Sequence, residues 1–505
     1  MTAIDQGATD MPPSPASAEP VPIKLVLSAV AATLLFASLG QTIVSTALPV
    51  MVADLGGMDK ITWVMTAYLL ASTIGAPVAG KLGDLYGRKP VLQWGIGVFI
   101  LGAVICGTAT SMGMVIAGRI IQGAGGGGLI VTCMALVGDL LPARERGKAQ
   151  AVLGAAFGIS TVIGPLLGGF LVQNLSWHWI FFVNFPVGAL AFIVLGIALP
   201  RRSDRSRKSV DYAGGALLAT LLASLVLISN TGGTVFAWAS PQVLALGIIA
   251  LSALALFIRV ERRAAEPILP MSLFANNTFV VMNAVGILVG MAMFGTITFL
   301  PFFLQVVKGI SPTSSGLFLV PMMGGLLSAS ILSGRYMART GRYKFLPVAS
   351  TALLSLSLLS MTTLSVESPL WVIALSMVGI GLGLGPVFAI GVAAIQNAIP
   401  VSMLGVGTAS ANMFRLIGGA VGTAAFGALF STQLARSLEG EVPGMGDGGV
   451  RSIGADMVQA LPHDAQVLVM ESISQALHPV FWIAAGAALL ACLASLMLRE
   501  LPLSS

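Results

Sequence analysis

Two arginines lie deep inside long apolar stretches of this chain, where a charge needs a specific reason. Arg119 and Arg415 are flanked on both sides by hydrophobic and small residues. A charged side chain at the centre of a membrane helix costs about 2.5 to 3.5 kcal/mol on insertion scales, and it usually faces a cavity or a partner. Gln122 follows Arg119 by three positions and Asn412 precedes Arg415 by three, so each arginine shares a helix face with an amide.

We interpret both faces as turned toward a central substrate cavity or a polar cluster between helices. The alternative is structural, because an arginine can bind backbone carbonyls at a helix break or extend to the membrane surface. A polar stripe also follows the first apolar stretch, with Ser38, Gln41, Thr42 and Ser45 at helical spacing. The candidate cavity residues are therefore Gln41, Thr42, Ser45, Arg119, Gln122, Asn412 and Arg415.

Acidic residues are missing from the middle of every apolar stretch. The chain has 20 Asp and Glu residues, and those closest to the apolar stretches, such as Asp84, Asp139 and Asp211, lie at or near their ends. A membrane enzyme would need a nucleophile and base, or a metal cluster, within the spans. We therefore expect no enzyme activity, no metal site and no cofactor.

Membrane helices are the elements that must position these residues. Of the 505 residues, 56% are hydrophobic and 9% are charged, whereas about 25% are charged in a soluble protein. About 20 apolar residues suffice to cross a bilayer. We predict an all-α polytopic protein with 14 spans, near 25–52, 61–80, 91–110, 112–138, 149–172, 178–199, 212–230, 241–260, 278–304, 312–333, 345–365, 370–397, 403–434 and 478–498.

The basic residues predict the orientation of these spans. Of 26 Lys and Arg residues, 20 fall in loops on one side, four on the other side and two within spans. Positive residues are enriched in cytoplasmic loops, so both termini are predicted to be cytoplasmic. The topology accounts for the net charge of +6 and excludes the need for a nucleic-acid partner.

Two segments outside the spans complete the predicted domain organisation. Residues 1–22 are rich in Pro, Ala and Ser and lack a basic start, so we expect a disordered cytoplasmic tail and no signal peptide. Residues 436–477 are predicted to form an extracellular loop with a glycine-rich beginning.

An internal repeat divides the rest of the chain. The sequence Ala79-Gly-Lys-Leu-Gly-Asp-Leu-Tyr-Gly-Arg-Lys-Pro90 follows the second span, and Ser333-Gly-Arg-Tyr-Met-Ala-Arg-Thr-Gly-Arg-Tyr-Lys344 follows the tenth. Four positions coincide at one offset, and both segments are predicted to be loops. Duplicated halves are typical of secondary transporters. We predict a six-helix half at 23–200, an inserted two-helix segment at 201–265 and a second six-helix half at 266–505.

The first repeated segment closely resembles the loop signature of the major facilitator superfamily. Three further stretches agree with this resemblance, which covers about residues 24 to 499. Ala117-Gly-Arg-Ile-Ile-Gln-Gly123 is similar to the fourth-helix arginine motif, and Gly164-Pro-Leu-Leu-Gly-Gly169 to the fifth-helix antiporter motif. Thr42-Ile-Val-Ser-Thr-Ala-Leu-Pro49 resembles the first-helix motif of the fourteen-helix drug:proton antiporters (QacA/EmrB-like).

The resemblance implies a cytoplasmic gate at the first repeated segment. It places Asp84 and Arg88 at the interface between the halves, with Asp139 as the partner of Arg88, so that these pairs act as a latch that breaks when the halves move. The alternative is that the charges only solvate a turn. The candidate gate residues are Gly80, Gly83, Asp84, Gly87, Arg88, Lys89 and Asp139.

The fifth-helix motif has two interpretations. Gly164, Pro165, Gly168 and Gly169 are linked by the resemblance to sealing the path during obligatory exchange. The simpler interpretation is helix packing, because small residues four positions apart let helix backbones approach closely.

The chain departs from the fourteen-helix branch at one position that concerns proton coupling. That branch usually has an Asp where this chain has Gly40. The candidates for proton coupling are therefore Asp139 first, with Arg119 and Asp84, since a carboxylate beside Arg88 could exchange its ion pair for a proton. Without a buried carboxylate, selection of cationic substrates is also weakened.

The resemblance implies a secondary active transporter in a bacterial cytoplasmic (inner) membrane. We expect export of hydrophobic or amphiphilic drug-like compounds by alternating access, in exchange for protons. The alternatives are a specific lipid or metabolite transporter without proton coupling, and a ligand sensor that has lost transport. The expected partners are a small amphiphilic substrate, protons and the lipid bilayer, and the sequence identifies no accessory envelope protein.

Overall fold

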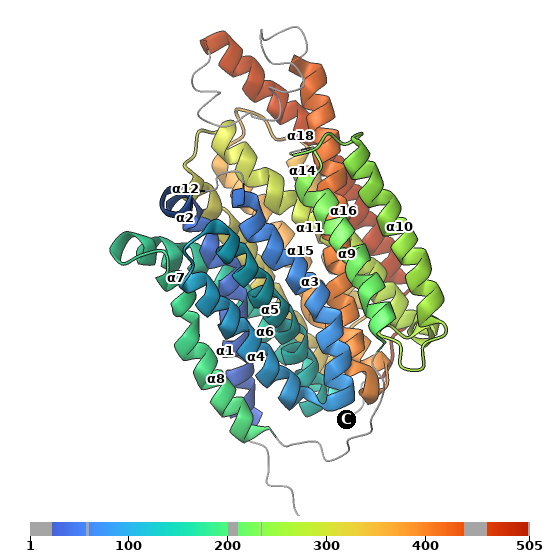
Figure 1. Ribbon diagram of the computed structural model, residues 1–505. Coiled ribbons are helices and arrows are strands. Elements are labelled where there is room, and N and C mark those ends of the chain that lie inside the picture. The colour runs from blue at the N-terminus through green and yellow to red at the C-terminus, as the bar shows by residue number, and fades with distance from the viewer. Residues whose placement is uncertain (1–22, 57–59, 200–210, 234, 439–461, 503–505) are drawn as a thin grey trace, which may run out of the picture.

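The chain is a bundle of long helices (Figure 1). The computed structural model describes residues 23–56, 60–199, 211–233, 235–438 and 462–502. Within these ranges no β-strand is present, and the one extended contact is an isolated bridge between Gly232 and Phe236. The predicted tail at 1–22 lies outside the described residues.

The helices are bounded as follows. In chain order they are α1 Ile23–Thr42, η1 Ile43–Thr46, α2 Leu48–Leu55, α3 Ile61–Tyr86, α4 Arg88–Gly107, α5 Met112–Leu140, α6 Ala143–Asn174, α7 Trp179–Phe182, α8 Asn184–Ala198, α9 Tyr212–Thr231, α10 Pro241–Glu261, η3 Met271–Ala275, α11 Asn277–Val306, α12 Pro312–Leu317, α13 Leu319–Thr340, α14 Phe345–Met361, α15 Leu370–Ala398, η4 Val401–Met403, α16 Leu404–Leu438 and α18 His463–Leu496.

The number of membrane crossings agrees with a polytopic all-α protein. In the described part of the chain, 12 helical stretches are long and apolar enough to span a membrane. The long helix α6 and the shorter apolar helix α14 lie at two further predicted spans. Each of the fourteen predicted spans therefore falls on a helix.

The first predicted span, 25–52, is broken where a continuous helix was expected. Helix α1 ends at Thr42, and the chain continues as the 3-10 turn η1 before α2 begins. Pro49 lies in the first turn of α2, where its missing N–H costs nothing, whereas it could not continue α1 without loss of a hydrogen bond.

The repeated segments are mostly helical, so their prediction as loops was wrong. Helix α3 continues to Tyr86 and α13 to Thr340, and each ends at a glycine with positive φ. Gly87 has φ of 90° and Gly341 has φ of 69°. Glycine tolerates this conformation without a steric penalty, and it terminates a helix within one residue.

The predicted extracellular loop 436–477 is also shorter than expected. Helix α16 extends to Leu438, and α18 already begins at His463, well before the predicted start of the last span at 478. The residues between them, 439–461, lie outside the described part. The sequence also allows a surface helix within Ala455 to Ser474, and the polar start of α18 falls in that stretch.

The long helices pack in two groups. The first group comprises α1 to α8 and the second comprises α11 to α18, each with its own apolar core. The groups touch each other through α3 with α16 and through α6 with α13 and α15. Helices α9 and α10 pack against each other, and α9 lies against α3 and α16 (Figure 1). The exact domain boundaries at 200 and 265 stay a prediction.

Two glycine contacts bring the groups together at one end of the bundle. A Cβ atom at Gly80 would lie 2.8 Å from the carbonyl oxygen of Gly405, and one at Gly334 would lie 2.7 Å from the carbonyl oxygen of Gly147. Gly80 and Gly334 are the equivalent glycines of the internal repeat. Each therefore allows a backbone of one group to touch a backbone of the other, and we call this region the Gly80/Gly334 end.

We predict that Gly334→Leu separates α13 from α6, because the new side chain occupies the space of the Gly147 backbone. Spin labels on cysteines at the exposed positions Arg144 and Arg339 would report a longer distance in the variant. Gly324→Leu, on the same helix at a position with open space around it, should leave the distance unchanged. An unaltered distance in Gly334→Leu would contradict the proposed close contact.

Candidate functional site

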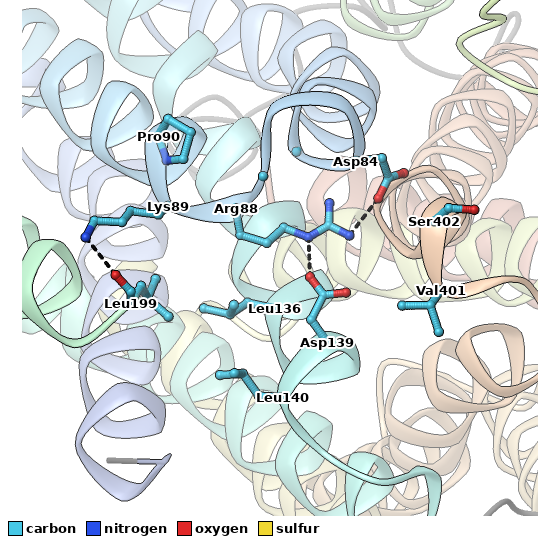
Figure 2. A pocket seen from close by; sticks show the side chains of 12 residues that line it. Asp84, Arg88, Lys89, Pro90, Leu136, Asp139, Leu140, Leu199, Val401 and Ser402 are labelled. Carbon is cyan, nitrogen blue, oxygen red and sulfur yellow. Dashed lines mark hydrogen bonds and ion pairs between the residues drawn. The ribbon is translucent and has the colours of Figure 1, made fainter. Parts of the chain in front are cut away.

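Arg88 holds two carboxylates at the Gly80/Gly334 end (Figure 2). Its Nη2 donates to Asp84 Oδ1 at 2.6 Å, and its Nε donates to Asp139 Oδ2 at 2.7 Å. The turn at Gly87 starts α4 with Arg88, directly beside the last turn of α3 that carries Asp84. Asp139 comes from the last turn of α5. The structure thus brings the three predicted residues together, and we call Asp84, Arg88 and Asp139 the charge cluster.

Asp84 also reaches the second group of helices. Its two oxygens accept hydrogen bonds from the backbone N–H groups of Gly405 and Val406, each at 2.8 Å. These N–H groups belong to the first turn of α16, where backbone donors have no partner within the helix and the helix dipole attracts negative charge. Asp84 therefore links the groups, whereas Arg88 and Asp139 both belong to the first.

The two carboxylates differ in their exposure. The Asp84 side chain is 5% exposed and that of Asp139 is 27% exposed. A cavity of about 420 Å³ borders the charge cluster, with Leu136, Leu199 and Val401 among its apolar walls (Figure 2). Asp139 is thus the member of the cluster that water reaches more easily.

The other candidate gate residues have distinct positions. Lys89 points away from the cluster and donates to the carbonyl of Leu199 at 2.6 Å (Figure 2). A Cβ at Gly83 would lie 2.6 Å from Arg88 Nη1, so this glycine leaves room for the guanidinium. Gly80 provides the contact with α16, and Gly87 provides the turn.

A second set of bonds across the two groups was missed in the sequence. Arg146 donates to the carbonyl of Gln396 at 3.0 Å, and Gln150 Nε2 lies 3.4 Å from Gln396 Oε1. Gln396 in turn donates to Met134 O and to Thr408 Oγ1. Gln150 and Gln396 are amides within predicted spans, and this signal could have found them, whereas Gln122 was selected because it shares a helix face with Arg119.

Two acidic residues at and after the end of α10, Glu261 and Glu266, were also not identified as functional candidates in the sequence. Glu261 is buried, and its carboxylate accepts from the backbone N–H groups of Ile268 and Leu269, each at 3.2 Å. Glu266 forms an ion pair with Lys81 of α3 at 2.9 Å. The residues that follow α10 are thereby attached to the first group.

Arg119 is fully enclosed between α1, α3 and α5. Its Nη1 donates to Gly40 O at 2.6 Å and to Gln122 Oε1 at 2.8 Å, and its Nε donates to Val64 O at 3.2 Å. The guanidinium carbon lies 4.1 Å above the centre of the Tyr68 ring. Both Arg119 and Gln122 are 0% exposed, so in this conformation they form a polar cluster and do not line an open path.

Arg415 has a more open environment. It is half-buried and donates from Nη2 to Asn412 Oδ1 at 2.6 Å. Its guanidinium carbon lies 4.1 Å above the ring centre of Phe388. The predicted pairing of this arginine with an amide on its own helix face is thus present, and the pair stays a candidate for substrate contact.

Ser38 and Thr42 of the polar stripe contact α6. Ser38 and Ser160 form a hydroxyl–hydroxyl bond, and Thr42 donates to the carbonyl of Ser160 at 3.0 Å. Gln41 is half-buried, and the side chain of Ser45 lies outside the described part of the chain. The stripe therefore includes residues that join two helices of the first group.

The glycines of the fifth-helix motif divide between the two interpretations. A Cβ at Gly164 would collide with Thr42 Oγ1, and one at Gly168 would collide with Thr46 Oγ1, so both are needed for packing against the break in the first span. Gly169 has open space around it, and the side chain of Pro165 lies outside the described part. Packing therefore explains two of the three glycines.

An uncharged cavity of about 160 Å³ lies where α9 meets both groups. Thr73, Ser229, Thr298 and Thr423 contribute hydroxyl groups to its lining, with Phe294 among the apolar residues. The described residues contain no group of three His, Cys, Asp or Glu side chains suited to a metal ion. The lining of this cavity can bind both polar and apolar groups of a small molecule.

We predict that Asp84→Asn opens the contact between α3 and α16. The amide can no longer accept two backbone N–H groups and a guanidinium, and it leaves Arg88 short of a counter-charge. Spin labels at the exposed positions Tyr86 and Val401 should move apart, and Asp464→Asn, an exposed acid on α18, should change nothing. Identical distances in all three proteins would refute this role of Asp84.

Comparison with known proteins agrees with the fold. Residues 30–423 match the family described as Major Facilitator Superfamily. The chain is 39% identical over 486 residues to an uncharacterized MFS-type transporter of Mycobacterium tuberculosis, covering 96% of this chain and 71% of that protein. It is 39% identical over 411 residues to the multidrug transporter protein MdtP of Bacillus subtilis, covering 81% of this chain and 75% of that protein.

Solved structures show the same architecture at low sequence identity. The crystal structure of the human organic anion transporter MFSD10 aligns with a TM-score of 0.63 at 15% identity, over 94% of this chain and 99% of that one. The proton:xylose symporter XylE aligns with a TM-score of 0.60 at 14% identity, over 93% of this chain and 94% of that one. The chain is therefore a multi-pass membrane transporter that belongs to the major facilitator superfamily and not an enzyme.

Proposed function

We propose that this transporter exports amphiphilic drug-like compounds in exchange for protons, as a member of the fourteen-helix drug:proton antiporter branch. The chain is similar to the multidrug transporter protein MdtP and to multidrug resistance protein 3 of Bacillus subtilis, at 39% and 32% identity. A fungal efflux pump, FUS6 of Gibberella moniliformis, is 31% identical over 86% of the chain. These names support efflux as the direction of transport.

The observation that carries the proposal is the contact of Asp84 with α16. This carboxylate holds the first turn of a helix in the other group, and it is itself held by Arg88. Helix ends that meet through a few charge-assisted bonds can separate and meet again as rigid bodies. In this proposal the Gly80/Gly334 end is a gate that is closed in the present conformation. The distribution of basic residues supports its location on the cytoplasmic side of a bacterial inner membrane.

Asp139 is the proposed proton carrier of the cluster. It makes one ion pair, with Arg88, and water reaches it more easily than Asp84. Protonation of Asp139 removes one of the two counter-charges of Arg88, so the cluster loosens and the gate can open. The proton comes from the outer side and leaves toward the cytoplasm while the gate is open, and Arg88 pairs with Asp139 again as the gate closes. Asp84 keeps its role as the bridge to α16.

Arg119 contributes to the same cycle without releasing a proton. A guanidinium stays charged in proteins, so its contribution is electrostatic and positional. Arg119 donates hydrogen bonds to backbone carbonyls of α1 and α3. It therefore fixes the end of α1 beside the break in the first span. Arg119→Ala is expected to abolish transport for this reason, as is Asp84→Asn for the loss of the gate.

A transporter without proton coupling is the second candidate. It is favoured by Gly40, which stands in the first span where the drug:proton antiporters have a carboxylate. Such a protein would move a specific lipid or metabolite down its gradient. A sensor that has lost transport would bind ligand without moving it, and a liposome flux measurement distinguishes it from both transporters.

We predict that the purified protein in liposomes moves amphiphiles together with protons when a pH gradient is imposed. A panel of cationic, neutral and anionic amphiphiles is followed beside a lumenal pH dye. Asp139→Asn should lower the proton flux per substrate by at least about tenfold, since one ionisable group of the cycle is removed. Glu145→Gln, an exposed acid near the same end, serves as the control.

Three results would contradict parts of the proposal. Substrate movement without proton flux in the wild type would favour the uncoupled transporter. Undiminished proton flux in Asp139→Asn would exclude Asp139 as the carrier. Binding of amphiphiles without any flux would favour the sensor.

A further inference from the structure

The buried polar cluster around Arg119 has hydrogen-bond donors left over. Within the described part of the chain, Arg119 Nη2 and Gln122 Nε2 are buried and have no hydrogen-bond partner. Arg119 and Gln122 are both 0% exposed. Buried polar groups are nearly always paired, so two adjacent unpaired donors mark a place where an acceptor fits.

The cluster also lacks a negative charge. The partners of Arg119 among the described residues are the carbonyls of Gly40 and Val64 and the amide oxygen of Gln122, all of which are neutral. Its contact with the ring of Tyr68 compensates only part of a full charge. A buried cation without a counter-ion is strongly unfavourable, and arginine cannot escape by losing its proton.

Gly40 lies beside these donors, and the ring of Phe99 packs against it, 2.6 Å from where a Cβ would stand. A Cβ atom built there would lie 3.5 Å from Gln122 Nε2, and the carbonyl of the same residue receives Arg119 Nη1 at 2.6 Å. Three helices converge here, because Gly40 lies on α1, Val64 on α3 and Arg119 on α5. The donors thus meet where these helices converge, and the Phe99 ring closes the place beside Gly40 in this conformation.

We propose that Arg119 and Gln122 form an anion-binding site that takes a carboxylate or a monovalent inorganic anion. The guanidinium offers Nη2 and the amide offers Nε2, a pair of donors that suits two oxygens of a carboxylate or one chloride ion. The site fills when the helices that enclose it separate during the transport cycle. This inference rests on the proposed export of amphiphiles and deepens it, since it selects those that carry a carboxylate or that move with an inorganic anion.

The site differs from the environment of the other intramembrane arginine. Arg415 is half-buried, lies above Phe388 and donates to Asn412. Among the described residues, its nitrogens are not buried atoms without a hydrogen-bond partner, unlike Arg119 Nη2. Arg415→Gln therefore removes a comparable charge from a span without touching the proposed site.

The test is a thermal unfolding titration of the purified full-length protein in a non-ionic detergent and a low-salt zwitterionic buffer. One series adds sodium chloride, and a second adds laurate beside dodecanol, which has the same chain without the charge. We expect chloride, laurate or both to raise the unfolding midpoint in a saturable way, by on the order of 2 °C. Arg119→Gln should abolish the rise with either anion, and Arg415→Gln, at a candidate for substrate contact, should retain the rise with chloride.

Two further variants keep the test decisive if Arg119→Gln does not fold. Gln122→Leu should raise the anion concentration at half-saturation by about tenfold, because one donor to a charged group is lost. Gly40→Asp supplies a carboxylate within the chain, combined with Phe99→Leu because the new Cβ lies 2.6 Å from the Phe99 ring. This double variant should melt higher without added anion and show no further rise, and Phe99→Leu alone is its control.

Several outcomes would overturn the proposal. They are an absent rise with both anions in the wild type, a full rise in Arg119→Gln, and equal rises with laurate and dodecanol in the absence of a chloride effect. A rise with chloride alone identifies an inorganic anion, and a larger rise with laurate than with dodecanol identifies a substrate carboxylate. Because binding is measured without flux, failure of transport in liposomes would refute the proposed function and leave this site intact.

Discussion

The first turn of any helix has backbone N–H groups that the helix itself cannot pair, and at α16 two of them donate to Asp84. This interaction joins the two groups of helices through a single carboxylate that is itself held by Arg88. The close contacts of Gly80 with Gly405 and of Gly334 with Gly147 only form when these helix ends meet. The charge cluster and the glycines are therefore parts of one closed state, in which electrostatic attraction and backbone packing support each other.

Charges in the interior of the bundle follow a different rule from those at its end. At the Gly80/Gly334 end, Arg88 has two carboxylates within hydrogen-bond distance. Inside the first group, Arg119 has only neutral acceptors among the described residues. The first arrangement is compensated without any ligand, whereas the second is favourable only with further negative charge. In our two proposals, the gate works by its own ion pairs, and the interior responds to the anion that it binds.

Much of the architecture could be predicted from hydrophobic runs, because a membrane helix must satisfy its own backbone and shows this in about 20 apolar residues. The proximity of Asp84, Arg88 and Asp139 followed from a recognisable motif. The bond from α16 to Asp84 could not be predicted, since backbone N–H groups leave no trace in residue types. The enclosure of Arg119 was equally hidden, because an arginine and an amide on one face fit both a cavity and a buried cluster. Helix ends such as Tyr86 were misplaced because polar residues continue a helix as readily as they end it.

The ion pair between Lys81 and Glu266 has a mechanical consequence for the connection between the groups. It attaches the chain after α10 to α3, while the next long helix, α11, already belongs to the second group. The short stretch between Glu266 and α11 therefore limits the distance between the two groups. Part of its length is stored in the turn of η3 and in the bonds that Glu261 makes to Ile268 and Leu269. This connection can lengthen when the turn of η3 unfolds and the Glu261 hydrogen bonds break. While the ion pair holds, the two groups can separate at this end only as far as that extra length allows.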